Sequence, residues 1–96
     1  PELPRGFHVD QNYPNPFNSG TIIRYRVPTA QRIRIQVYDT FGKEVKQLHN
    51  AVVAPGEHVI RWNGTNEELS RVASGVYFIR ILSSNSTKVL KVLHLK

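Results

Sequence analysis

Hydrophobic and polar residues alternate along much of this chain. In residues 32–38, Ile33, Ile35 and Val37 share one face of an extended segment, while arginine and glutamine occupy the other face. Residues 21–27 alternate in the same way, and no window keeps the period of a helix. Alternation of this kind is typical of half-buried strands in an antiparallel sheet.

Turn-forming residues divide the chain into short segments. Pro14 and Pro16 break any hydrogen-bonded ladder, and Gly42 supplies the positive φ that a tight turn needs. A longer polar loop covers residues 63–74, with a short helical turn expected at 66–69. We expect strands at residues 7–11, 20–27, 32–39, 43–49, 57–63, 75–83 and 87–95. About seven short strands at this spacing predict an all-β fold, an immunoglobulin- or fibronectin-III-like antiparallel β-sandwich.

The predicted core is formed by the inward positions of these strands. The final strand is apolar on both faces, apart from Lys88, Lys91 and His94. Such a strand is either an interior strand over the core or an edge strand without a partner. We expect the core to contain Ile23, Tyr25, Ile33, Ile35, Val37, Val45, Leu48, Ile60, Trp62, Tyr77, Ile79, Ile81, Val89 and Leu93.

Composition narrows the class of protein. The 96 residues fit one domain, and no segment is apolar for long enough to span a membrane as a helix. The sequence has no cysteine, which excludes disulfides and thiolate metal sites. Its 13 Lys and Arg against 7 Asp and Glu give a formal net charge of +6, which favours anionic partners. The opening Pro-Glu-Leu-Pro, without an initiator Met, predicts a piece of a longer polypeptide that starts at the end of a linker.

The sequence contains no recognisable catalytic or metal-binding motif. His8, His49, His58 and His94 lie in no such motif, and no Gly-x-Ser-x-Gly occurs, so we expect neither enzyme activity nor a cofactor. Hard oxygen ligands do gather in one loop, although their spacing fits no EF-hand, and calcium binding there stays open. These ligands are Asn63, Thr65, Asn66, Glu67 and Glu68.

The sequence gives little support for binding of nucleic acid or sugar. Two outward ladders of arginine fit solvated strand faces on different sheets, and an RNP-like aromatic motif is missing, so no nucleic-acid partner is expected. Trp62 alternates in register with Ile60, which points it into the core. Sugar binding through an exposed tyrosine stays open. The arginines are Arg24, Arg26, Arg32 and Arg34, and the tyrosines are Tyr13, Tyr25, Tyr38 and Tyr77.

Three segments together resemble a known family. They are Gln-Asn-Tyr-Pro-Asn-Pro-Phe-Asn at 11–18, Val-Tyr-Asp-Thr-Phe-Gly-Lys-Glu-Val at 37–45, and Ala-Ser-Gly-Val-Tyr-Phe-Ile-Arg-Ile at 73–81 followed by Thr-Lys-Val-Leu-Lys at 87–91. Their order and spacing resemble the C-terminal sorting domain of the type IX (Por) secretion system of Bacteroidetes. Residues 58–64 and the loop after them also resemble the immunoglobulin-like domain of flagellar hook-capping proteins.

The resemblance implies a function in export. Domains of the sorting family are recognised in the periplasm and carried through the outer-membrane translocon, so that the cargo is secreted or held at the cell surface. In many of them a sortase-like peptidase cuts just upstream, and the cargo is joined to lipopolysaccharide. Here the cut would fall within residues 1–10 or before them. We therefore divide the chain into the end of a linker, 1–11, and a C-terminal sorting and anchoring domain, 12–96, fused to an upstream cargo.

The candidate residues for recognition by the translocon lie in the first and last of the family segments. Lys88, Lys91 and Lys96 leave a basic edge on the final strand, which would be read as charge or by strand addition. The same lysines also fit simple protection of an edge strand against aggregation. Gly75 is expected to let the backbone bend or approach a neighbour closely. The candidates are Tyr13, Pro14, Asn15, Pro16, Phe17, Gly75, Tyr77, Lys88 and Lys91.

Two other functions are alternatives to sorting. A carbohydrate-binding module of a glycoside hydrolase would bind sugar through an exposed aromatic strip. A passive structural spacer, as in hook-capping proteins, would show neither binding nor an effect on export.

Overall fold

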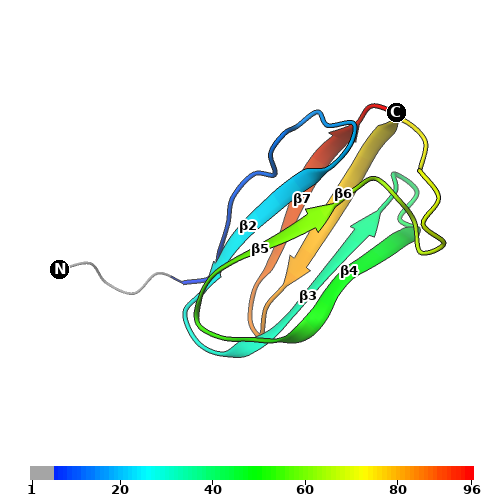
Figure 1. Cartoon of the computed structure of the whole chain (residues 1–96). Helices are drawn as coiled ribbons and strands as arrows, with labels where there is room; N and C mark the ends of the chain where they lie inside the picture. Colours follow the sequence, from blue (N-terminus) through cyan, green and yellow to red (C-terminus); the bar gives the residue numbers. More distant parts are fainter. Residues whose placement is uncertain (1–5) are drawn as a thin grey trace.

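Seven strands form two antiparallel sheets in the computed structural model, which describes residues 6–96 (Figure 1). One sheet has the strand order β1-β2-β5 and the other β4-β3-β6-β7, so the expected all-β sandwich is confirmed. No helix in the described part of the chain is long and apolar enough to cross a membrane. The strands are β1 (His8–Val9), β2 (Thr21–Val27), β3 (Gln31–Tyr38), β4 (Glu44–Val53), β5 (Gly56–Trp62), β6 (Gly75–Leu82) and β7 (Thr87–His94).

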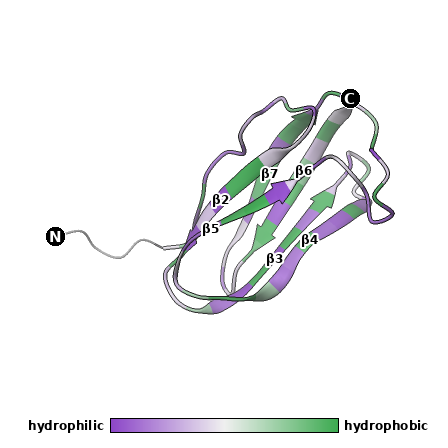
Figure 2. Ribbon diagram, in the orientation of Figure 1, coloured by the Kyte–Doolittle hydropathy of each residue, from purple (hydrophilic) through white to green (hydrophobic). Residues whose placement is uncertain are grey.

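The strands follow the alternating pattern of their sequences. Figure 2 shows hydrophobic and hydrophilic bands alternating along β3, with the edge strand β4 mostly hydrophilic. β4 continues to Val53, beyond the expected end at residue 49, because it pairs with β3 along its whole length. Two shifts of register, after Ile35 and after Val37, mark bulges in this pair.

The core lies between the sheets and is built from β-branched and aromatic side chains. Most of the predicted core is confirmed, with Val45, Leu48 and Ile60 packed at its margin. Burying these inward faces is the main driving force that holds the two sheets together. The buried hydrophobic residues are Phe17, Ile23, Tyr25, Val27, Ile33, Ile35, Val37, Trp62, Tyr77, Ile79, Ile81, Leu90 and Val92.

β7 is an edge strand, and its inward face is not the predicted one. Leu90 and Val92 face the core, whereas Val89 is 56% exposed and Leu93 lies half-buried on the outer face. The prediction that Val89 and Leu93 belong to the core is wrong. Because both faces of this strand are apolar, its pattern does not distinguish inside from outside.

The sandwich begins before residue 12. Within β1, His8 pairs with Arg26 and Val9 with Tyr25, so these two residues already belong to the smaller sheet. The expected end of a linker, 1–11, therefore overlaps the sandwich at its C-terminal side. Its first part, residues 1–5, lies outside the described residues.

Candidate functional site

Residues 13–17, which we call the clasp, run beside the outer edge of β7, just before β2 in the chain (Figure 1). The Asn15 side chain accepts a hydrogen bond at Oδ1 from the Leu93 N–H at 2.9 Å, and its Nδ2 donates to the Lys91 carbonyl at 3.2 Å. A carboxamide carries the same kinds of donor and acceptor as a peptide group. Asn15 therefore replaces one peptide group of the strand that would otherwise pair with β7.

The backbone of Phe17 continues this pairing. Its N–H donates to the Leu93 carbonyl at 3.0 Å, and its carbonyl accepts from the Leu95 N–H at 2.8 Å. In an antiparallel ladder, the N–H and carbonyl of every second residue point to the same side of the strand. Val89, like Lys91 and Leu93, therefore turns both groups to the outer side of β7, but it lies beyond the reach of the clasp. In the part of the chain that the structure describes, the β7 edge is therefore closed at its C-terminal half and open at its N-terminal half.

The clasp is anchored in the core and tied to the other sheet. The Phe17 ring is 2% exposed and lies 5.3 Å from Trp62 between ring centroids. On the other side, Tyr13 exchanges two backbone hydrogen bonds with Ile22 of β2, at 2.9 and 3.0 Å. The Thr21 hydroxyl also donates to the Pro14 carbonyl at 2.8 Å. The clasp thus joins the smaller sheet to the edge of the larger one.

Proline shapes the outer side of the clasp. Pro14 and Pro16 are exposed and both follow cis peptide bonds. Proline has no N–H, so these two positions cannot donate to a further strand. The clasp covers part of one edge without presenting a complete new one.

A hollow of about 370 Å³ lies between the clasp and the outer face of β6 and β7. Asn15, Pro16 and Lys91 line it together with Val76 and Leu93. Three predicted site residues, from the first and last family segments, therefore meet at one place. The contact between Asn15 and Lys91 joins positions 76 residues apart in the chain.

The two candidate lysines of β7 do not share a face. Both are exposed, but a spacing of three residues in a strand turns Lys88 and Lys91 to opposite sides of the sheet. Lys91 lies opposite Phe78 on the outer face, whereas Lys88 lies opposite Ile81. The basic edge is therefore split between the two faces.

The two candidate site residues on β6, Gly75 and Tyr77, each have a structural role in the fold. The Tyr77 ring is 7% exposed, and its hydroxyl donates to the Ala73 carbonyl at 2.6 Å. Burial, together with the charge of Asp39, raises the pKa of Tyr77. Gly75 has a φ of +148°, which a residue with a side chain rarely adopts, and its Cβ position is open. The expected bend, not a close approach, accounts for this glycine.

His94 is a buried residue that sequence reasoning did not place in the core. It is fully buried, its ring lies 4.7 Å from that of Phe17, and neither ring nitrogen has a hydrogen-bond partner among the described residues. Burial lowers the pKa of His94, the nearby carbonyls of Phe17 and Val72 oppose this, and the charges of Arg71 and Lys96 add to it. The neutral imidazole therefore packs directly beneath the clasp.

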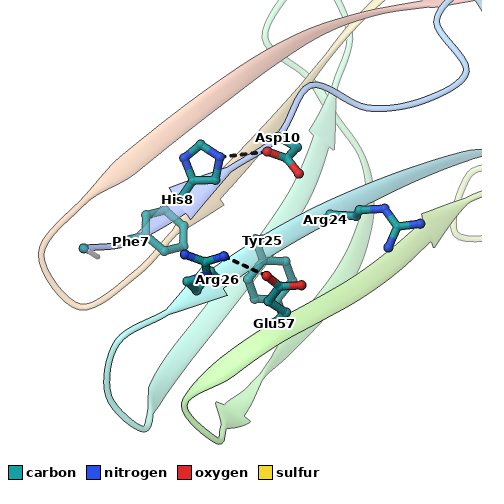
Figure 3. A pocket seen from close by; sticks show the side chains of 8 residues that line it. Phe7, His8, Asp10, Arg24, Tyr25, Arg26 and Glu57 are labelled. Atoms are coloured by element: carbon teal, nitrogen blue, oxygen red, sulfur yellow. Dashed lines mark hydrogen bonds and ion pairs between the residues drawn. The ribbon is translucent and has the colours of Figure 1, made fainter. Parts of the chain in front are cut away.

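A second hollow, of about 400 Å³, lies on the smaller sheet (Figure 3). His8 pairs with Asp10 at 2.7 Å, and Arg26 pairs with Glu57 at 2.7 Å across its floor. All four side chains are well exposed. Phe7 and the buried Tyr25 line the hollow together with these side chains, so its walls are mixed polar and apolar.

Several of the oxygen ligands expected in the 63–74 loop are hydrogen-bonded within the domain. Asn66 Oδ1 accepts from the N–H groups of Glu68 and Ser70, and a single turn links the Asn66 carbonyl to the Leu69 N–H in place of the expected helical turn. Glu67 accepts from the Gln47 N–H at 2.8 Å. Residues 6–96 hold no group of three or more His, Asp or Glu side chains placed to bind a metal.

The aromatic residues do not form an exposed strip in the described structure. Trp62, Tyr25 and Tyr77 are buried, and the Tyr38 ring is covered by the guanidinium of Arg80 at 5.0 Å. Tyr13, by contrast, is 78% exposed. A flat sugar platform made of several rings is therefore absent from the part of the chain that the structure describes.

Comparisons with known proteins agree with this architecture. The family model described as "Secretion system C-terminal sorting domain" matches residues 11–94. No curated protein matches the chain. Two proteins of Porphyromonas gingivalis have similar solved structures. One is dimeric latent PorU, with a TM-score of 0.73 and 15% identity over 95% of this chain and 10% of PorU.

The other is PorZ, an essential surface component of the type IX secretion system, with a TM-score of 0.62 and 24% identity over 95% of this chain and 12% of PorZ. The chain thus spans about a tenth of each protein, and at these identities the likeness concerns the fold. The match to the family model covers nearly the whole sequence, including the clasp and β7. The chain belongs to the family of secretion system C-terminal sorting domains.

Proposed function

We propose that this domain carries an upstream cargo through the type IX translocon to the outside of the cell, where the cargo is released or attached to the surface. Membership of the family implies a sorting signal for export. The single observation that carries the finer proposal is the meeting of the clasp with β7, where Asn15, Pro16 and Lys91 border one hollow. We propose that the translocon reads this surface and the open part of the β7 edge.

Several properties of the clasp support such a role. It is held rigidly by Phe17 and Asn15, so it presents a fixed shape at little cost in conformational entropy. Beside it, the backbone of Val89 offers a donor and an acceptor, without partners among residues 6–96, for strand addition. The exposed ammonium groups of Lys88 and Lys91 flank this position on the two faces. An extended segment with acidic side chains would match both the backbone and the charges.

The fate of the cargo forms a second part of the proposal. A sortase-like peptidase would cut before Tyr13, within residues 1–10 or upstream of them, and the cargo would then be joined to anionic lipopolysaccharide. Gly6 is exposed, and in the described chain its segment pairs with β2 through the two residues of β1 and a hydrogen bond from the Asp10 N–H to the Arg24 carbonyl. Opening so short a strand costs little, which would make this segment accessible to a peptidase.

Export of a reporter tests the recognition surface. The domain is fused behind a periplasmic reporter in a host with the type IX system, and the reporter is measured in periplasm, outer membrane and medium. Lys91→Glu and Lys88→Glu should each reduce the exported fraction. Lys43→Glu is the matched control, because Lys43 is exposed in the turn between β3 and β4. If the Lys88→Glu, Lys91→Glu double variant is exported like the wild type, the translocon does not read these lysines. Their role would then be to protect the edge strand against aggregation.

A further inference from the structure

The outer face of the larger sheet carries a row of cations, of which the sorting proposal uses only Lys91. β3 turns Arg32 and Arg34 outward, about 7 Å apart as alternate residues of a strand. Arg80 of β6 lies opposite Gln36, one such step beyond Arg34. Lys91 of β7 lies opposite Phe78, a further step along. The row therefore crosses three strands and ends at the hollow beside the clasp.

Only neutral groups hold these arginines in the described structure. Arg32 donates to Asn50 Oδ1 at 3.0 Å, and Arg34 donates to Gln47 Oε1 at 3.3 Å. The outward positions of the four strands carry these four cations but a single carboxylate. That carboxylate belongs to Glu44, which lies opposite Tyr38. The positive charge of the row is thus left for a partner to neutralise.

Arg80 is fixed before any partner arrives. Its Nη2 donates to Gln36 Oε1 at 2.8 Å and to the Tyr38 hydroxyl at 2.7 Å, and its guanidinium lies over the Tyr38 ring. Its Nε is buried and has no hydrogen-bond partner among residues 6–96. A guanidinium held in place loses little rotamer entropy when it binds a carboxylate, and arginine is enriched at the energetic centres of protein interfaces.

Apolar groups accompany the row. Val89 is 56% exposed and lies opposite Arg80, and Val52 is 62% exposed and lies opposite Arg32. Arginines beside exposed apolar side chains, next to a hollow, fit a protein-binding surface, in which arginine is enriched. A stacking surface for nucleic acid is disfavoured because Arg80 already covers the Tyr38 ring. A second copy is disfavoured because each chain carries a net charge of +6.

We infer that the outer face of β3, β6 and β7 docks an acidic protein surface, with carboxylates spaced to meet Arg34, Arg80 and Lys91. This inference rests on the proposed sorting function, for which it names the chemistry of the partner. The partner would cover the cation row and insert a side chain into the hollow beside Lys91. The docking surface therefore extends over the sheet face, well beyond the edge of β7.

A matched pair of charge reversals tests the inference in the reporter fusion. Arg34 and Arg24 are both exposed and lie outward on middle strands, β3 in one sheet and β2 in the other. Arg34→Glu should lower the rate of export about tenfold, because it removes the steering charge and adds a repulsive one. Arg24→Glu should export like the wild type. Arg80→Gln, which removes the charge but keeps a polar hydrogen-bond donor, should lower export as well.

A photo-cross-linking residue distinguishes the kinds of partner. Val89 and Val59 are 56% and 53% exposed on the outer faces of opposite sheets, so they form a second matched pair. The cross-linker at position 89 should give one discrete protein adduct that is lost when Arg34→Glu is added, and position 59 should give none.

Three outcomes overturn the inference. If the wild-type fusion stays in the periplasm, both the proposed sorting function and this inference are contradicted. If Lys91→Glu blocks export while Arg34→Glu and Arg80→Gln do not, the sorting function stands and only the inference fails. If Arg34→Glu weakens binding to phosphatidylglycerol vesicles or to heparin without removing an adduct at position 89, the partner is not an acidic protein.

Discussion

Gly64 lies against the buried ring of His94, so replacing it with alanine tests how tightly the core is packed beneath the clasp. Its φ is +77°, a conformation that costs a residue with a Cβ about 1–2 kcal/mol. The new Cβ would also lie 2.9 Å from His94 Cε1. The His94 ring is enclosed by Phe17, Trp62 and Tyr77 and has little room to move. Overpacking of this kind adds about 1–3 kcal/mol.

Gly42 supplies the control for this substitution. Its φ is +82°, close to that of Gly64, but no atom lies within 4 Å of its Cβ position. Gly42→Ala should therefore show the backbone cost alone. Urea unfolding measures both variants, and the domain as a whole has a stability of about 5–15 kcal/mol. Gly64→Ala should lose about 1–3 kcal/mol more than Gly42→Ala. Equal losses would refute the packing of Gly64 against His94.

Three further predictions concern the same region. Because burial lowers the pKa of His94, the unfolded chain binds this proton at a higher pH than the folded chain does. Stability should fall as the pH drops below about 6.5, by at most about 1.4 kcal/mol per pH unit until the folded pKa is reached. In urea unfolding at a series of pH values, His94→Gln should lose less stability below about pH 6.5 than the wild type does. The same pH dependence in both proteins would contradict a lowered pKa of His94. Asn15→Ala should cost about 1 kcal/mol, because the Leu93 N–H loses its partner. It should also promote self-association through the opened edge, and a variant that stays monomeric at high concentration in sedimentation velocity would argue against edge closure. Val92→Ala should cost about 2 kcal/mol and Val89→Ala less than about 0.5 kcal/mol in thermal unfolding, so similar costs would reverse the assigned faces of β7.

Alternation predicted the structure well where one face of a strand is polar. In β3, arginines on one side and isoleucines on the other leave a single way to place the strand on the core. In β7, both faces are apolar, and the inward set depends on pairing with β6, which no local pattern encodes. The split of Lys88 and Lys91 between two faces does follow from their spacing, although the sequence-based interpretation treated them as one edge.

The contacts of the clasp lie beyond local sequence reasoning. The resemblance to a family pointed to the segment, but nothing near Asn15 in the chain predicts that its carboxamide pairs with Lys91 and Leu93. The burial of His94 likewise needs Phe17 and Gly64, which come from distant parts of the chain. Such positions depend on tertiary packing, which local patterning does not describe.

Export of a reporter that carries this domain at its C-terminus is the most direct test of the sorting function. The intact domain should bring the reporter to the cell surface or the medium in a host with the type IX system. Deletion of residues 87–96 should leave the reporter in the periplasm, because it removes β7 and with it the partner of the clasp. A reporter that remains in the periplasm with the intact, folded domain attached would contradict the proposed sorting function.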